Sequence, residues 1–291
     1  WVFFPYAIYL SSNRIWGYCL DAFVMTLVLW ATFAISYAEV RKWQWAAYGI
    51  LWGVAALTNP EMLTTLPVLL GWAVWRQRQR GHTWRPAAVV TLAALVLTVT
   101  PWFVRNYRTF GHFVPFRGTF WMIFWESNTG DTSDIYPDWS TPAHNETEMA
   151  EYRRLGEMGY VAEKRQMSLE FLREHPGLFL RLTGKRFTFF WTGFWSLRSD
   201  YLAGEPFAFA NIGFCSTLTI LMFAGIRRAL KLNWEVVIPL AGVLIFYPVV
   251  YYVIHPGMDY RQAIEPVVVV LLGVFAARSA KLATPVAVPS T

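Results

Sequence analysis

Seven apolar segments constrain the fold of this chain more than any other feature. Each is 14 to 22 residues long and carries few or no charged side chains. Because a helix rises about 1.5 Å per residue, about 20 apolar residues cross the roughly 30 Å hydrocarbon layer of a membrane. The sequence therefore predicts an all-α fold, a polytopic transmembrane helical bundle. The segments are Gly17–Ala38, Trp43–Thr58, Met62–Trp75, Pro86–Val104, Pro206–Ile226, Val236–Ile254 and Gln262–Ala277.

The composition excludes several other classes of protein. Charged residues make up 15% of the chain, whereas ordinary soluble domains carry about 25%. Aromatic residues make up 18%, which excludes a disordered chain. Cys19 and Cys215 both lie in apolar segments, so neither a disulfide framework nor a cysteine-ligated zinc site is expected. The sequence also lacks the motifs of P-loop, dinucleotide-binding, zinc-protease and serine-hydrolase enzymes.

The basic residues between the apolar segments predict the orientation. If each segment crosses once, four clusters of Lys and Arg fall on one side, which is then cytoplasmic: Arg41–Lys42, Arg76–Arg85, Arg227–Lys231 and Arg278–Lys281. These short clusters account for the net charge of +6, so no nucleic-acid partner is expected. The junction Thr58–Glu61 contains Asn-Pro, a turn dipeptide, which favours a hairpin between two short spans over a kinked pair.

This topology divides the chain into four regions. Residues 1–104 hold transmembrane helices, the first of them partial, because the chain begins inside an apolar stretch. Residues 105–205 form one large extracytoplasmic loop, residues 206–278 three further transmembrane helices, and residues 279–291 a cytoplasmic tail. We expect a functional N-terminal portion to precede this chain.

The large loop contains one predicted amphipathic helix. Apolar residues recur at spacings near three and four over Glu146–Glu174, after Asn145 as a capping residue and before His175-Pro176 as a stop. The turn-rich acidic stretch 129–142 is either a mobile lid or a connector. The basic and aromatic stretch from Arg181 to Trp195 is typical of the headgroup level of a membrane.

Acidic residues at membrane depth are costly and therefore mark candidate sites. Asp21 lies near the start of a span, and Glu61 begins another. Glu265 lies four residues after Arg261 in the last span. Each also has a structural explanation: a cap or interfacial residue for Asp21, a charge favoured by the helix dipole for Glu61, and an i, i+4 ion pair for Arg261 and Glu265.

The predicted topology brings polar residues from four loops to the non-cytoplasmic face. A polar site at that membrane surface, covered by the large loop, is the simplest common account. His255 and Asp259 lack the spacing of a metal-ligand set, so no metal site is predicted; a divalent cation is compatible with the sequence, but no ligand set can be identified. The residues are Asp21, Glu61, Arg105, Asn106, His255, Asp259, Arg261 and Glu265.

Five stretches of the chain resemble the GT-C fold glycosyltransferases, which use polyprenyl-phosphate sugars and include the protein O-mannosyltransferases and lipid A aminoarabinose transferases. The most specific is TPWFVRNYRTFGHFVPF, and WGVAALTNPEMLTTLPVLL is similar except that Asn59 stands where Arg is usual. The others are PYAIYLSSNRIWGYCLDAFVMTLVLW, EHPGLFLRLTGKRFTFFW and DYRQAIEPVVVVLL. The acidic pair that this family carries in its first extracytoplasmic loop is not in this chain, so the resemblance implies a fragment of an enzyme.

The resemblance implies transfer of a sugar from a polyprenyl-phosphate donor to a lipid, glycan or protein acceptor. The reaction would occur at the outer face of a multi-pass protein of the bacterial cytoplasmic membrane, in contact with membrane lipids. Asp21 would assist a principal base that lies upstream of this chain. The implied substrate-binding residues are Glu61, Arg105, Asn106, Tyr260, Arg261 and Glu265, and Arg181, Lys185 and Arg186 are weaker candidates for the lipid phosphate.

Two other classes of function stay open on the sequence. A transporter or flippase of lipid-linked or anionic solutes would also use acids inside the membrane and kinked helices. Against it, the two halves show no internal repeat, and a long extracytoplasmic loop with a surface helix suits a lid over an acceptor. A non-catalytic subunit of a membrane assembly is the third interpretation.

Overall fold

The computed structural model describes residues 17–128, 141–193, 208–256 and 258–277, together with residues 8 and 199. These residues form an all-α structure: 86% of them are helical, and none lies in a strand. Most of the predicted partial first helix, most of the stretch 129–142, the end of the aromatic stretch and the predicted C-terminal tail lie outside the described residues.

Within this part of the chain, three helical runs are long and apolar enough to cross a membrane. They are α2 (Tyr18–Tyr37), α5 (Arg85–Phe110), and the run Phe209–Val253, which joins α10 (Ala208–Phe246) to α11 (Val249–Val253). Helix α5 leaves most of its apolar surface uncovered, and Leu97 is 72% exposed. An uncovered apolar helix of this length is typical of contact with lipid.

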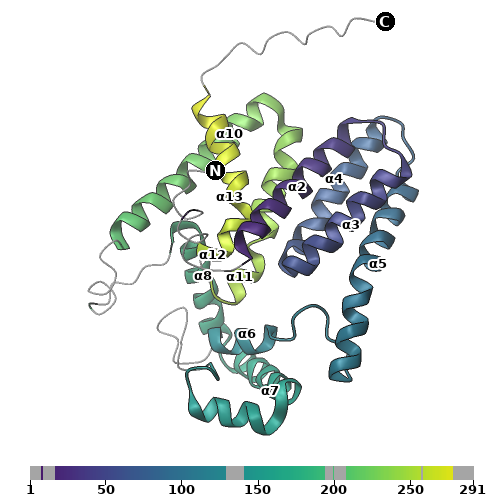
Figure 1. Cartoon of the computed structure of the whole chain (residues 1–291). Coiled ribbons are helices and arrows are strands. Elements are labelled where there is room, and N and C mark those ends of the chain that lie inside the picture. Colours follow the sequence, from purple (N-terminus) through teal and green to yellow (C-terminus); the bar gives the residue numbers. More distant parts are fainter. Residues whose placement is uncertain are drawn as a thin grey trace, which may run out of the picture.

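Helix α3 (Lys42–Thr58) packs closely against α5 (Figure 1). The contact depends on small residues: a Cβ added at Gly49 would lie 2.2 Å from the carbonyl oxygen of Thr91. The Thr91 hydroxyl donates to the carbonyl of Trp45 at 3.2 Å. Close approach at glycine with hydrogen bonding by threonine is how apolar helices associate where burial alone gives no driving force.

The predicted turn between the two short apolar segments is present. Asn59 is extended, the 3-10 helix η1 (Pro60–Thr65) follows it, and α4 (Leu66–Gln79) then packs against α2. The Asn59 side chain accepts from the backbone N–H of Glu61 at 3.2 Å, which caps η1. This turn places Asn59 and Glu61 beside the start of α2.

Helix α10 is two helices joined at a break. Asn233, with φ −159° and ψ 99°, leaves the helical conformation just after the basic cluster that the sequence places between two segments. The first part packs against α13 (Glu265–Ala276), and an ion pair between Arg76 and Glu235 ties the second part to α4. The short α12 (Met258–Arg261) and η3 (Gln262–Ile264) lead into α13.

The predicted amphipathic helix has the expected ends but is not continuous. Helix α7 spans Glu146–Glu174, and the Asn145 side chain caps it by accepting from the backbone N–H groups of Thr147 at 2.9 Å and Glu148 at 3.1 Å. Gly156 has φ 69°, a left-handed conformation that glycine adopts readily, and it bends the chain into two arms. The predicted helix is therefore two helical arms joined at Gly156.

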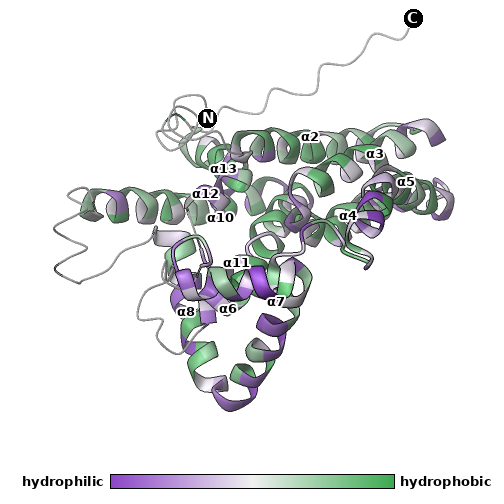
Figure 2. Ribbon diagram, turned by 60° about the horizontal axis from the view of Figure 1, so that its bottom comes forward, coloured by the Kyte–Doolittle hydropathy of each residue, from purple (hydrophilic) through white to green (hydrophobic). Residues whose placement is uncertain are grey.

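Helices α6 (Phe120–Asn128) and α7 form a layer at one end of the molecule, and α8 (Pro176–Thr192) connects this layer to α10 and α11 (Figure 1). Colouring by hydropathy distinguishes α7 in this layer, which is largely hydrophilic, from α2, α3 and α5, which are largely hydrophobic (Figure 2). The functional candidates lie where the two parts meet.

Candidate functional site

Two adjoining pockets lie between the start of α2, the turn at η1, the segment before α6 and the residues around α11 and α12. The first, about 460 Å³, is the polar pocket, and it is also lined by Gly17, Tyr18, Asp21, Thr58 and Asn59. The second, about 360 Å³, is the apolar pocket, with Phe116, Phe120, Ile123, Val250 and Ile254 among its other lining residues. Four residues line both pockets: Glu61, Arg117, Tyr251 and Tyr260.

Asp21 and Asn59 form the innermost polar contact of the polar pocket. Asn59 Nδ2 donates to Asp21 Oδ2 at 2.9 Å and lies 3.2 Å from the hydroxyl of Tyr247. Both Asp21 and Asn59 are only 6% exposed. Because the asparagine is neutral, it orients the Asp21 carboxylate without cancelling its charge, so Asp21 stays available to hydroxyl groups of a ligand.

Tyrosine rings form the wall opposite Asp21. Tyr251 and Tyr260 stack with ring centroids 4.6 Å apart, and Tyr18 meets Tyr260 edge-on at 5.8 Å. The hydroxyls of Tyr247 and Tyr251 are 3.2 Å apart. Stacked aromatic rings with polar tips suit a ligand that has both apolar and polar faces.

His255 lies behind this wall as a neutral ring. Burial and the nearby charge of Arg186 lower the pKa of His255 to about 4, so the imidazole carries no charge at neutral pH. Its Nε2 lies 2.9 Å from the hydroxyl of Tyr260, and its Nδ1 lies 3.4 Å from Ser127 Oγ. His255 therefore orients Tyr260. No three His, Cys, Asp or Glu side chains of the described ranges converge as metal ligands.

Arg117 is the cation of the site, and the sequence interpretation missed it. It lines both pockets, is exposed, and its Nη2 lies 3.5 Å from the carbonyl oxygen of Thr58. The sequence feature that could have revealed it is its position: Arg117 directly follows the FVPF end of the stretch with the most specific resemblance. Two carboxylates, Asp21 and Glu61, share the polar pocket with it.

Of the residues that the resemblance implies for catalysis or binding, the structure brings Asp21, Glu61 and Tyr260 together and puts the others outside both pockets. Arg105 is exposed on α5 outside both pockets, where its Nη1 donates to Asn106 Oδ1 at 3.0 Å. Asn106 is 1% exposed, and its Nδ2 donates to the carbonyls of Val114 at 3.0 Å and Phe116 at 3.3 Å.

Arg261 and Glu265 form a buried ion pair away from the pockets. The Arg261 Nε and Glu265 Oε1 atoms are 2.5 Å apart, and the two side chains are 0% and 2% exposed. Arg261 Nη1 also donates to the carbonyl of Trp191 at 3.0 Å. The sequence left open that Arg261 and Glu265 form a structural ion pair at spacing i, i+4, and this is the geometry observed.

The weaker phosphate candidates on α8 lie in two environments. Arg181 and Lys185 are exposed, whereas Arg186 is 1% exposed. Arg186 donates to Asn128 Oδ1 at 3.0 Å, to the carbonyl of Val253 at 3.1 Å and to that of Ser127. Burial lowers its pKa to about 10. Arg186 therefore joins α6, α8 and α11 and has no open face for a phosphate.

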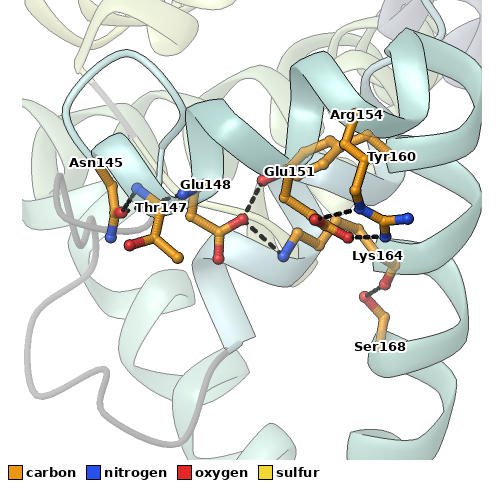
Figure 3. Close-up of polar contacts among 8 residues, drawn as sticks. All are labelled: Asn145, Thr147, Glu148, Glu151, Arg154, Tyr160, Lys164 and Ser168. Carbon is orange, nitrogen blue, oxygen red and sulfur yellow. Dashed lines mark hydrogen bonds and ion pairs between the residues drawn. The ribbon is translucent and has the colours of Figure 1, made fainter.

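A second polar cluster, also missed from the sequence, joins the two arms of α7 (Figure 3). Lys164 Nζ lies 2.8 Å from Glu148 Oε2, and the hydroxyl of Tyr160 donates to the same oxygen at 2.6 Å. Glu126 on α6 lies beside it, 2% exposed, and its Oε1 has no hydrogen-bond partner. Burial and the charge of Glu148 raise the pKa of Glu126 to about 7.

Comparisons of the chain with protein-family models, with curated proteins and with solved structures found no match. The chemistry of the site must therefore be argued from its own groups. The polar pocket offers two carboxylates that accept hydrogen bonds and one guanidinium that binds an anion. The adjoining apolar pocket offers a place for hydrocarbon.

Proposed function

We propose that this chain belongs to a polytopic membrane glycosyltransferase that moves a sugar from a polyprenyl-phosphate donor to a lipid, glycan or protein acceptor. One observation carries the proposal: a polar pocket and an apolar pocket adjoin and share Arg117 and Glu61. A molecule that fills both is an amphiphile with an anionic junction, which is the chemistry of a lipid phosphate linked to a sugar. The resemblance of five sequence stretches supports the same class.

The proposed reaction is an inverting sugar transfer. An acceptor oxygen or nitrogen forms a bond to the anomeric carbon, the bond from that carbon to the phosphate oxygen breaks, and polyprenyl phosphate leaves with the electron pair. A carboxylate takes the acceptor proton. By the resemblance, the principal base lies in a loop upstream of this chain.

Each residue of the pockets then has a role. Arg117 neutralises the departing phosphate, Asp21 and Glu61 accept hydrogen bonds from sugar hydroxyls, and Tyr260 forms the wall beside the sugar. The first prenyl units enter the apolar pocket against Phe116 and Phe120. Arg117 replaces Arg105 and Arg261 as the phosphate-binding residue of the proposal.

We further propose that the pockets face outward from the cytoplasmic membrane, as the distribution of Lys and Arg in the short loops favours. Arg80→Cys and Asp134→Cys, in a variant without Cys19 and Cys215, would be labelled in intact cells with a thiol reagent that does not cross membranes. Labelling of residue 134 but not of residue 80 is expected. The reverse pattern would overturn the orientation.

The direct test uses the full-length protein in vesicles with a labelled polyprenyl-phosphate sugar and a mixture of candidate acceptors. Release of polyprenyl phosphate together with labelled acceptor is expected, and Arg117→Ala should abolish both. Arg108→Ala is the matched control, because Arg108 is an exposed basic residue of α5 that lines neither pocket. Passage of the intact lipid-linked sugar across the bilayer without cleavage would replace the transferase by a flippase.

A further inference from the structure

We propose that Asn106 is a positioning residue that holds Arg117 at the mouth of the two pockets, assisted by Trp102 and Arg105. This proposal rests on the proposed function, since it concerns the cation that binds the lipid phosphate there. It gives the most specific sequence stretch, from Thr100 to Phe116, a role other than direct binding of the phosphate: its residues act on the backbone just before Arg117.

The contacts converge on one carbonyl group. The oxygen of Phe116 accepts from Asn106 Nδ2 at 3.3 Å and from Trp102 Nε1 at 3.2 Å. Asn106 Nδ2 also donates to the carbonyl of Val114 at 3.0 Å. One turn of α5, from Trp102 to Asn106, thus holds the segment that follows the helix, and the held segment ends one residue before Arg117.

The direction of the Asn106 amide is set by Arg105. Arg105 Nη1 donates to Asn106 Oδ1 at 3.0 Å, so the Asn106 oxygen is occupied and its NH2 group faces the carbonyls. The Arg105 guanidinium lies over the Trp102 ring, 5.2 Å from its centroid. Arg105 therefore contacts both Trp102 and Asn106, and these two side chains donate to the Phe116 carbonyl.

Phe116 needs this support because its backbone is strained. Its φ is +53°, the only positive φ of a residue other than glycine in the described part of the chain. The left-handed conformation costs about 1–2 kcal/mol for a residue with a Cβ, and it persists where neighbouring contacts determine it. The Phe116 ring also packs edge-on against Phe103 at 5.2 Å. A relaxed Phe116 would turn the Arg117 side chain to another direction.

Arg117 is held by one weak hydrogen bond and by the charges of Asp21 and Glu61, which attract it through space. Its side chain is exposed, and the Thr58 carbonyl, at 3.5 Å, is a weak partner at the limit of hydrogen-bond distance. The segment between α5 and α6 is not helical, so no backbone ladder fixes residue 117. Because these charges attract the guanidinium without fixing its direction, its place at the pockets also depends on the conformation of Phe116, and through it on Asn106.

The test measures preference for a phosphate, because a merely structural asparagine would not change that preference. Purified full-length protein in detergent is titrated with farnesyl phosphate and with farnesol. The phosphate preference is the dissociation constant of farnesol divided by that of farnesyl phosphate. Arg117→Ala should lower this ratio about 10- to 150-fold, the loss of one charge-assisted contact. Asn106→Ala should lower it by at least about 5-fold while farnesol binding stays within about 2-fold.

A double variant isolates the route through Arg117. Asn106→Ala should cause no further loss of phosphate preference in an Arg117→Ala background, because the group it positions is gone. Asn128→Ala is the matched control: Asn128 is also fully buried and also donates to two carbonyls, those of Phe124 and Val253. It should lower stability without changing the preference.

Each other outcome overturns a specific part of the argument. If Arg117→Ala lowers the preference and Asn106→Ala does not, Asn106 is not a positioning residue, and the proposed phosphate contact stands. If Arg117→Ala leaves the preference unchanged, the phosphate contact itself is wrong. Should Asn106→Ala fail to fold, Trp102→Phe removes the other donor to the Phe116 carbonyl and keeps a ring under Arg105; an unchanged ratio in that variant would overturn the positioning role.

Discussion

Two neighbouring arginine–carboxylate groups have opposite environments: one lines the pockets, and the other begins at Arg261, the residue after Tyr260. At the pockets, Arg117 is exposed and shares a cavity with Asp21 and Glu61. Between α10 and α13, Arg261 and Glu265 are 0% and 2% exposed and face each other at 2.5 Å. Each group contains an acid that meets the same sequence criterion, a charge at membrane depth: Asp21 and Glu61 in the first group and Glu265 in the second. Only the first has a surface that a ligand can reach.

The difference shows that a charged side chain that is buried with its partner is no longer available to bind a ligand. Taking Arg261 and Glu265 out of water carries a large desolvation cost, which their mutual attraction offsets. A lipid phosphate could bind Arg261 only by leaving the Glu265 carboxylate buried and unpaired, which is strongly unfavourable. At Arg117 no such exchange is needed.

The largest effect is expected from breaking the buried pair. Arg261→Ala leaves the Glu265 charge buried without its cation, so folding stability should fall by about 3–5 kcal/mol. The measurement is the thermal midpoint of the purified protein in detergent. Arg261→Met combined with Glu265→Leu should recover most of the loss, because it removes both charges and keeps the volume. A midpoint unchanged in Arg261→Ala would show that removing the arginine leaves no uncompensated charge in the core.

Glu126 sharpens the comparison, because it is buried like Glu265 and has no such ion pair. Its pKa is raised from the ordinary value of 4.5 to about 7. Between these values the folded protein binds more protons at Glu126 than the unfolded chain does, so folding stability falls as the pH rises through this interval. The full loss is roughly 3 kcal/mol for a shift of this size.

Glu126→Gln should remove this pH dependence. The thermal midpoint of the wild type should fall between pH 5 and pH 8 by more than that of the variant, and the two curves should meet near pH 5. The Glu148–Lys164 pair on α7 is present in both proteins, so the comparison of the two curves isolates Glu126. Parallel curves for the two proteins would show that Glu126 does not titrate there.

A third effect falls on activity and leaves stability nearly unchanged. Asp21→Asn keeps an oxygen that accepts from Asn59 but loses the charge that faces the pocket. Sugar transfer by the full-length protein should fall about 100-fold or more, the scale of losing one preorganised charged contact. Glu170→Gln, an exposed acid of α7 outside both pockets, should have no effect. Full activity of Asp21→Asn would leave Asp21 as a residue that only orients Asn59.

The sequence predicted local features better than it predicted the composition of the site. Apolar length and capping signals anticipated α2, the turn at Asn59 and both ends of α7, because these depend on neighbouring residues. The bend at Gly156 was missed, since a glycine inside a periodic pattern does not reveal a positive φ. The pocket gathers residues from α2, η1, the α5–α6 connection and α11–α12, so its members depend on tertiary packing. Arg117 and the exclusion of Arg261 both follow from that packing.

The smallest effect is expected at Arg105, which the resemblance placed in the substrate site. In the structure Arg105 lines neither pocket and acts only on the Asn106 oxygen at 3.0 Å. Arg105→Ala leaves the two N–H donors of Asn106 in place, so the preference for farnesyl phosphate over farnesol should fall by no more than about 3-fold, well below the loss expected for Arg117→Ala. Arg108→Ala provides the baseline for removing a charge from the same helix. If Arg105→Ala lowers the preference for farnesyl phosphate as much as Arg117→Ala does, Arg105 binds the phosphate directly. The charges that a ligand can reach would then include one on α5.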